Sequence, residues 1–187
     1  MKKILLHCCC APCAIYPVKV LLEENFEIIL FWDNFNIHPL MEYIRRLETL
    51  IQYAKDENIP LVKNVNYELE YFIDLIGRDR EFKKRCIPCY KVRIERTIQK
   101  AKEMGIEYFS STLFVSPYQD QEVMRKLSRE LAEKNNIKFF DKDFREGFRW
   151  AHQVARERGY YTQPYCGCIY SESERYQKKL KKYQKDA

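Results

Sequence analysis

The sequence has little glycine and no long apolar stretch. Only 5 of its 187 residues are glycine, and the first of them is Gly77. Backbone N–H groups approach a pyrophosphate where glycine leaves room for it. The lack of glycine after the first apolar run therefore argues against a nucleotide phosphate loop there. No apolar run approaches the roughly 18–20 residues that cross a bilayer, so we predict no membrane span.

The N-terminus also lacks the features of a signal peptide. Its apolar stretch, Ile4–Leu6, is too short and continues into cysteines rather than into a small-residue cleavage site. We therefore expect a cytoplasmic protein. The formal net charge is +6 and the pI is near 8.8, which is mildly basic. This balance permits an anionic partner such as RNA without requiring one.

Length and composition indicate one globular unit. Hydrophobic residues make up 46% and charged residues 32%, which is typical of a folded chain rather than a disordered one. We expect a single α/β domain over residues 1–187, ending in a basic helix over about residues 171–187.

Short apolar runs alternate with helical patterns along the chain, which predicts a parallel sheet with helices on both faces. The segment Ser116–Gln119 has the form of a capping box with proline at the first helical position, and it predicts a helix to about Asn135. Ligands of such sheets bind beyond the carboxyl ends of the strands. The predicted strands are Lys3–Cys9, Phe26–Trp32, Leu61–Val65, Tyr108–Val115 and Ile137–Phe140.

Eight cysteines form three clusters, His7–Cys13, Cys86–Cys89 and Tyr165–Cys168. Without a secretory signal, a disulfide framework is not expected, and packing does not need such clusters. A Cys-x-x-Cys pair brings two thiolates to one metal or cluster edge. A position at a helix start lowers the pKa of the thiols. The clusters therefore predict a metal site.

Thiolates alone do not distinguish zinc from iron–sulfur. A structural zinc site uses four cysteines, so two such sites would take all eight. The consecutive cysteines Cys8–Cys10 suit tetrahedral zinc poorly, because neighbouring residues of a strand point in opposite directions. They suit two adjacent metal centres at one strand end, and we therefore favour iron–sulfur.

Six blocks of the chain carry a further pattern: His7–Cys13, Asn36–Pro39, Arg85–Tyr90 with Arg93, Ser116–Gln119, Asp143–Gly147 and Tyr165–Ser171. In this order they resemble the QueH-type epoxyqueuosine reductases. The resemblance implies a Rossmann-like, adenine-nucleotide-hydrolase-like fold. It also implies reduction of the epoxide of epoxyqueuosine in tRNA, with an external electron donor. It implies a 4Fe–4S cluster and an additional mononuclear iron.

Site residues follow from the resemblance and from their positions. As the carboxylate ligand we name Asp143 before Asp33, because Asp143 lies in a matching block. The metal ligands expected first are Cys9, Cys10, Cys86, Cys89, Cys166 and Cys168, and Cys8 and Cys13 also match the motif. The candidate proton donors to the departing oxygen are His38, Tyr118 and Tyr170. The residues expected to contact RNA are Lys83, Lys84, Arg85, Arg93 and Arg145.

Three other functions are compatible with parts of the sequence. An ATP-dependent tRNA sulfur-transfer enzyme of related fold would need the missing glycine-rich loop. A zinc-bound RNA-binding module without catalysis would carry zinc and be colourless. A thiol oxidoreductase using Cys10 and Cys13 would leave the other two cysteine clusters unexplained.

Overall fold

A computed structural model describes residues 1–184 of the chain. Its centre is one sheet with strand order β3-β2-β1-β4-β5, in which every neighbouring pair is parallel. All carboxyl ends of the strands therefore lie at one edge, and the predicted α/β class is confirmed. The strands are β1 (Lys2–His7), β2 (Phe26–Trp32), β3 (Leu61–Lys63), β4 (Tyr108–Ser111) and β5 (Lys138–Phe139).

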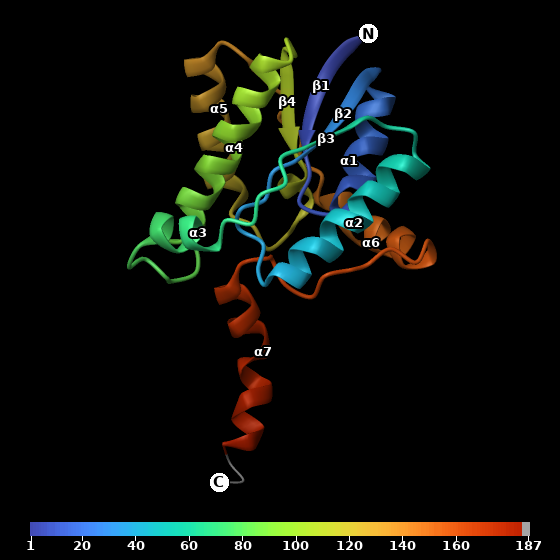
Figure 1. The fold of residues 1–187 in the computed structure, drawn as a ribbon. Helices are drawn as coiled ribbons and strands as arrows, with labels where there is room; N and C mark the ends of the chain where they lie inside the picture. The colour runs from blue at the N-terminus through green and yellow to red at the C-terminus, as the bar shows by residue number, and fades with distance from the viewer. Residues whose placement is uncertain (185–187) are drawn as a thin grey trace.

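Helices cover both faces of the sheet, as predicted (Figure 1). On β1, Ile4 and Leu6 pack into one core with α1, α2 and α6, whereas Leu5 packs into a second core with α4 and α5. This alternation follows from the two-residue period of a strand. The helices are α1 (Ala11–Glu23), α2 (Leu40–Asp56), α3 (Leu69–Ile76), α4 (Cys86–Glu103), α5 (Gln121–Asn135), α6 (Phe148–Glu157) and α7 (Ile169–Tyr183).

None of the helices within residues 1–184 combines the length and apolar character that spanning a membrane requires.

Helix α7 packs differently from the others: it projects from the body of the molecule, and none of its residues is buried (Figure 1). The last three residues of the predicted basic helix, 185–187, lie outside the described part.

The ends of β1 and β4 differ from the sequence prediction. The first strand, predicted to reach Cys9, ends at His7. The strand predicted to reach Val115 ends at Ser111, whose hydroxyl accepts a hydrogen bond from the Leu113 N–H and begins a short 3-10 helix. The predicted capping box at Ser116–Gln119 is wrong, because α5 begins at Gln121 with Asp120 as its N-cap. The side chain of Gln119 does not fold back onto the helix. It accepts a hydrogen bond from the Tyr90 hydroxyl and donates one to Sγ of Cys166.

Helix α6 docks on α1 through a close approach at Gly147. A Cβ at this position would lie 1.9 Å from Cγ of the Tyr16 ring, far inside van der Waals contact. The Tyr16 hydroxyl also donates a 2.6 Å hydrogen bond to Glu146. Only glycine therefore allows the Tyr16 ring and the start of α6 to occupy these positions.

We expect Gly147→Ala to lower the free energy of unfolding by about 1–3 kcal/mol, the usual cost of overpacking. Denaturant titration of the variant and of the wild type measures this loss. In a Tyr16→Ala background the same substitution should cost much less, because the clashing ring is gone. An equal loss in both backgrounds would contradict the steric account.

Candidate active site and metal centre

A cavity of about 560 Å³ opens at the carboxyl edge of the sheet. Segments far apart in the sequence line it: the turn from β1 into α1, the 3-10 helix after β4, α6, and the segment before α7. Its lining includes Cys9, Cys13, Thr112, Tyr118, Gln163 and Cys166. The fold thus brings two of the three cysteine clusters to one cavity, at the edge where ligands of parallel sheets bind.

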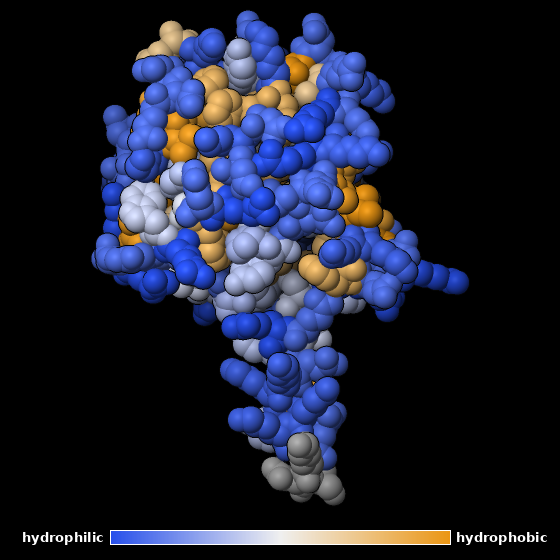
Figure 2. Space-filling view, turned by 180° about the vertical axis from the view of Figure 1, so that it is seen from behind, coloured by the Kyte–Doolittle hydropathy of each residue, from blue (hydrophilic) through white to orange (hydrophobic). Residues whose placement is uncertain are grey.

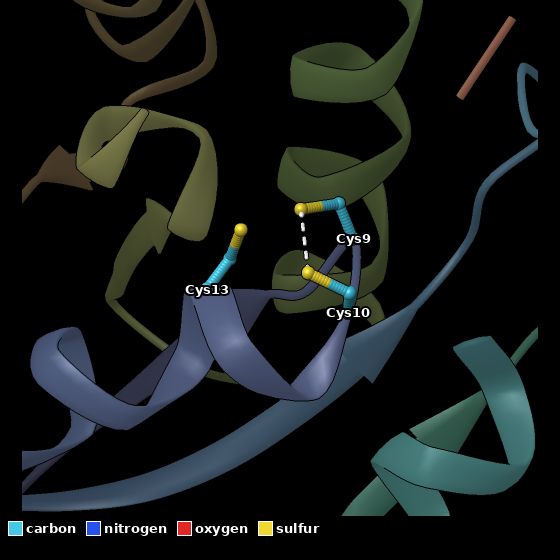
Figure 3. Close-up of side chains that lie close together, drawn as sticks. All are labelled: Cys9, Cys10 and Cys13. Carbon is cyan, nitrogen blue, oxygen red and sulfur yellow. Dashed lines mark hydrogen bonds between the residues drawn. The ribbon is translucent and has the colours of Figure 1, made fainter. Parts of the chain in front are cut away.

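The first thiol group consists of Cys9, Cys10 and Cys13, at the turn into α1 (Figure 3). Their sulfur atoms lie within 4.8 Å of one another, and all three residues are buried. The Sγ atoms of Cys9 and Cys10 are 3.7 Å apart. Hydrogen bonds from the other two thiols hold the pKa of Cys9 well below its usual value, while burial raises the pKa of Cys10.

The second thiol group consists of Cys86 and Cys89, at the start of α4, and Cys166 and Cys168, before α7. Burial and the charges of the other three thiols raise the pKa of Cys89 to about 12, against the opposing effect of the Arg93 charge. Burial and the charge of Cys168 raise the pKa of Cys166 to about 11. The thiols of this group are therefore close enough for the charge of one to affect the pKa of another. Cys89 and Cys168 also share one apolar cluster.

Gly167 makes the turn that holds the last two cysteines. Its φ of +145° suits glycine, and a Cβ there would lie 3.3 Å from both Nη1 of Arg46 and Cγ1 of Ile37. The Gly167 carbonyl accepts a 2.8 Å hydrogen bond from the His38 N–H. The turn is therefore pressed against the loop that follows β2.

Two buried arginines accompany the thiol groups. Arg93 donates a 2.8 Å hydrogen bond to Asn34, and its charge lowers the pKa values of Cys9, Cys89 and Cys166. Its charge therefore acts on thiols of both groups. Arg46 pairs with Glu42 and donates to the Cys166 carbonyl at 2.8 Å. Buried positive charge favours thiolate, the form of cysteine that binds metals.

Two glutamines that the sequence analysis missed contact the sulfurs. Gln163 donates to Sγ of Cys10 at 2.8 Å, and Gln119 donates to Sγ of Cys166 at 3.2 Å. Gln163 thus contacts the first thiol group, and Gln119 contacts the second. Gln119 belongs to the block Ser116–Gln119, but its contact with a sulfur, like that of Gln163, depends on distant segments and has no local signal.

Cys8 and Asp143 lie apart from these groups. Sγ of Cys8 donates to the Leu6 carbonyl at 3.2 Å, and the residue packs in the core on the opposite face of the sheet from Cys9. The Asp143 carboxylate accepts hydrogen bonds from Arg145, which lowers its pKa. Within residues 1–184, the three residues of the first thiol group are the one set of three or more Cys, His, Asp or Glu whose ligand atoms lie this close.

The predicted proton donors occupy three different environments. Tyr118 lines the cavity and is 72% exposed. His38 is fully buried, and burial lowers its pKa to about 4. The Tyr170 ring stacks on the Arg85 guanidinium, with 5.7 Å between cation and ring centroid. His152 of α6, which the sequence analysis missed, lines the cavity beside Phe148.

The residues expected to contact RNA also separate by burial. Lys83 and Lys84 are exposed in the loop before α4, and Arg145 is half-exposed and paired with Asp143. Arg85 is buried, and its guanidinium binds both carboxylate oxygens of Glu174, at 2.8 and 2.7 Å. Arg85 and Arg93 thus serve contacts inside the protein instead of the outer surface.

The fold has a solved counterpart. A predicted subunit of tRNA methyltransferase from Methanocaldococcus jannaschii superimposes with a TM-score of 0.56, over 84% of this chain and 75% of that one. At 13% sequence identity, this likeness concerns the fold alone.

Sequence comparison is more specific. Epoxyqueuosine reductase QueH of Dehalococcoides mccartyi is 35% identical over 94% of this chain and 96% of its own length. The enzyme of the same name from Thermotoga maritima is 33% identical over 95% of this chain and 94% of its own length. The family model described as epoxyqueuosine reductase QueH matches residues 4–174, and the match ends before the basic outer half of α7. The predicted resemblance is thereby confirmed, and the chain belongs to the epoxyqueuosine reductase QueH family of oxidoreductases.

Proposed function

We propose that this chain reduces the epoxide of epoxyqueuosine in tRNA to the cyclopentene of queuosine. The observation that carries the proposal is the convergence of thiols from two distant segments, the turn into α1 and the segment before α7, on one cavity, in a member of this family. The reaction consumes two electrons and two protons and releases the epoxide oxygen as water. An external donor supplies the electrons.

The donor set fits a 4Fe–4S cluster with an additional iron. Two thiolates on one tetrahedral metal, at about 2.3 Å each, lie about 3.8 Å apart. The 3.7 Å between the sulfurs of Cys9 and Cys10 matches this spacing. The second thiol group supplies the four thiolates that a 4Fe–4S cluster takes. We therefore propose that Cys86, Cys89, Cys166 and Cys168 hold the cluster and that the first thiol group holds the additional iron.

When bound, these iron centres would supply single electrons and a Lewis acid for the epoxide oxygen. The chain's own residues set the conditions. Arg93 and Arg46 keep positive charge beside the thiolates, which limits the electrostatic cost of several negative sulfurs in one place. The N–H groups of Gln163 and Gln119 donate to the sulfurs, and such hydrogen bonds raise the reduction potential of iron–sulfur centres.

The cavity itself would receive the modified base. Its volume of about 560 Å³ lies within the usual range of small-molecule sites. An aromatic wall of Tyr118, Phe148 and His152 lines one side, and Phe148 contacts both of the others edge-on or tilted. Extruded bases of single-stranded RNA commonly stack on such side chains.

Of the groups that could deliver a proton to the departing oxygen, Tyr118 and His152 line the cavity. His38 is enclosed by Tyr67 and Phe72, and its lowered pKa keeps it neutral at pH 7. We therefore assign proton delivery to Tyr118 or His152 and a packing role to His38.

Anaerobically purified protein should contain about five iron atoms and about four sulfide ions per chain and absorb near 400 nm. Cys89→Ser and Cys168→Ser should lose the sulfide and the visible band, because each removes a thiolate of the second group. Cys9→Ser should lower the iron content while retaining sulfide. Metal and sulfide analysis with absorption spectra measures all three.

Cys8→Ala is the matched control for these variants. Its sulfur faces the other core, so the variant should keep the wild-type iron and sulfide content. Colourless wild-type protein that carries zinc would contradict the reductase and favour a zinc-bound RNA-binding module.

Replacing the proton donor should lower kcat by about 10²-fold or more, the range for general acid catalysis. We expect this loss in either Tyr118→Phe or His152→Gln, with iron content unchanged. Single-turnover assays on epoxyqueuosine-containing tRNA measure it, and His38→Gln is the control. A loss of that size in His38→Gln alone, with metal intact, would overturn the assignment.

A further inference from the structure

The outer half of α7 concentrates nearly all of the chain's net charge. Residues 175–183, here called the basic arm, contain five lysines or arginines and no acidic residue. Five of the chain's six net positive charges therefore lie in these nine residues, and all other residues together carry one. The basic residues of the arm are Arg175, Lys178, Lys179, Lys181 and Lys182.

The positive charges of the basic arm form no ion pairs with acidic residues in the described part of the protein. None of α7 is buried, and the helix stands clear of the body (Figures 1 and 2). No ion pair among residues 1–184 includes a basic residue of the arm. Like charges three and four residues apart on a helix repel one another. An arm of this composition is therefore suited to an anionic partner.

The basic arm begins at the cavity. Helix α7 starts at its N-cap, Cys168, a residue of the second thiol group. Ser171, Glu174 and Arg175 of its first two turns line the cavity. Its charged face thus starts at the mouth of the site and extends outward for about 13 Å, at about 1.5 Å per residue.

The direction of the arm is fixed by its base. Glu174 binds the buried Arg85 guanidinium through both carboxylate oxygens, and the Tyr170 ring packs on the same guanidinium. Since Arg85 immediately precedes α4, this contact fastens the first turns of α7 to the body. The arm is therefore anchored at the cavity end and free of contacts at its outer end.

We infer that the basic arm is a docking surface for the phosphate backbone of the tRNA whose modified base enters the cavity. This inference rests on the proposed function. A nucleotide held in the cavity must have its flanking phosphates pass the cavity mouth, where the arm begins. Lysines supply the charge that such phosphates need, and the partly exposed Tyr176 and the exposed Tyr183 offer faces for stacking.

Other polyanions fit the arm less well. An amphipathic helix that lies on a membrane needs a broad apolar face, and among residues 175–183 the single aliphatic residue is Leu180. An acidic protein could meet the charge, but nothing would require it to bind at the cavity mouth. The position of the arm beside the site favours RNA.

The test compares two four-lysine variants of the full, iron-loaded chain. The arm variant carries Gln at Lys178, Lys179, Lys181 and Lys182, since glutamine keeps helix propensity and removes the charge. The control carries Gln at exposed lysines on other helices, with the same change in net charge: Lys55, Lys102, Lys126 and Lys134. Circular dichroism and iron content verify that both are folded and loaded.

For the arm variant we expect the Kd for tRNA to rise on the order of 10-fold or more at 100–150 mM salt. The slope of log Kd against log salt should become shallower by about 1 to 3, because each lost phosphate contact removes about 0.7 to 0.9 from it. The KM for tRNA should rise while kcat stays unchanged. The control should shift Kd by less than about 2-fold.

Equal Kd values for the arm variant and the control would overturn the inference. It would also fall if the arm variant lost binding to phosphatidylserine vesicles while keeping its affinity for tRNA. Wild-type protein that leaves the epoxide of bound tRNA unreduced, with iron and donor present, would overturn the proposed function instead. The binding and turnover measurements therefore distinguish the two failures.

Discussion

The functional end of this molecule depends on placing many thiols beside buried positive charge. Metal-binding thiols must lose their protons, and each thiolate disfavours the next. The charge of Arg93 acts on thiols of both groups, and Arg46 holds the turn at Cys166. Both guanidiniums are themselves anchored, Arg93 by Asn34 and Arg46 by Glu42. The loop after β2, through Asn34, and helix α2, through Glu42, therefore hold these two positive charges in place.

The parallel sheet makes this arrangement possible. Its carboxyl edge gathers the turn after β1, the loop after β2 and the 3-10 helix after β4, which are distant in the sequence. The remaining segments fold back onto that edge from α4, α6 and α7. Two glycines allow this close packing. Gly147 leaves room for the Tyr16 ring at the start of α6, and Gly167 makes the turn before α7 that lies against Arg46.

Much of this could be predicted from the sequence, since the relevant signals are local. Apolar runs and cysteine spacing are read within about ten residues, so the strands and the thiol clusters were predicted close to their observed positions. What could not be read depends on distant contacts. Gln119 looked like part of a helix cap because nothing nearby reveals that Cys166 needs a donor. Arg85 and Arg93 looked like surface charges because burial of an arginine is decided by partners far along the chain. The orientation of Cys8 toward the opposite core, by contrast, follows from the alternation of side chains along a strand, and the sequence analysis did not apply it to that residue.

The central claim is that the two thiol groups share one iron-containing centre at the cavity. Anomalous diffraction at the iron absorption edge, from crystals grown without oxygen, tests it most directly. We predict iron density beside both Cys9 and Cys89, with the cavity open next to the iron. Density confined to one thiol group, or a zinc edge in place of iron, would contradict it.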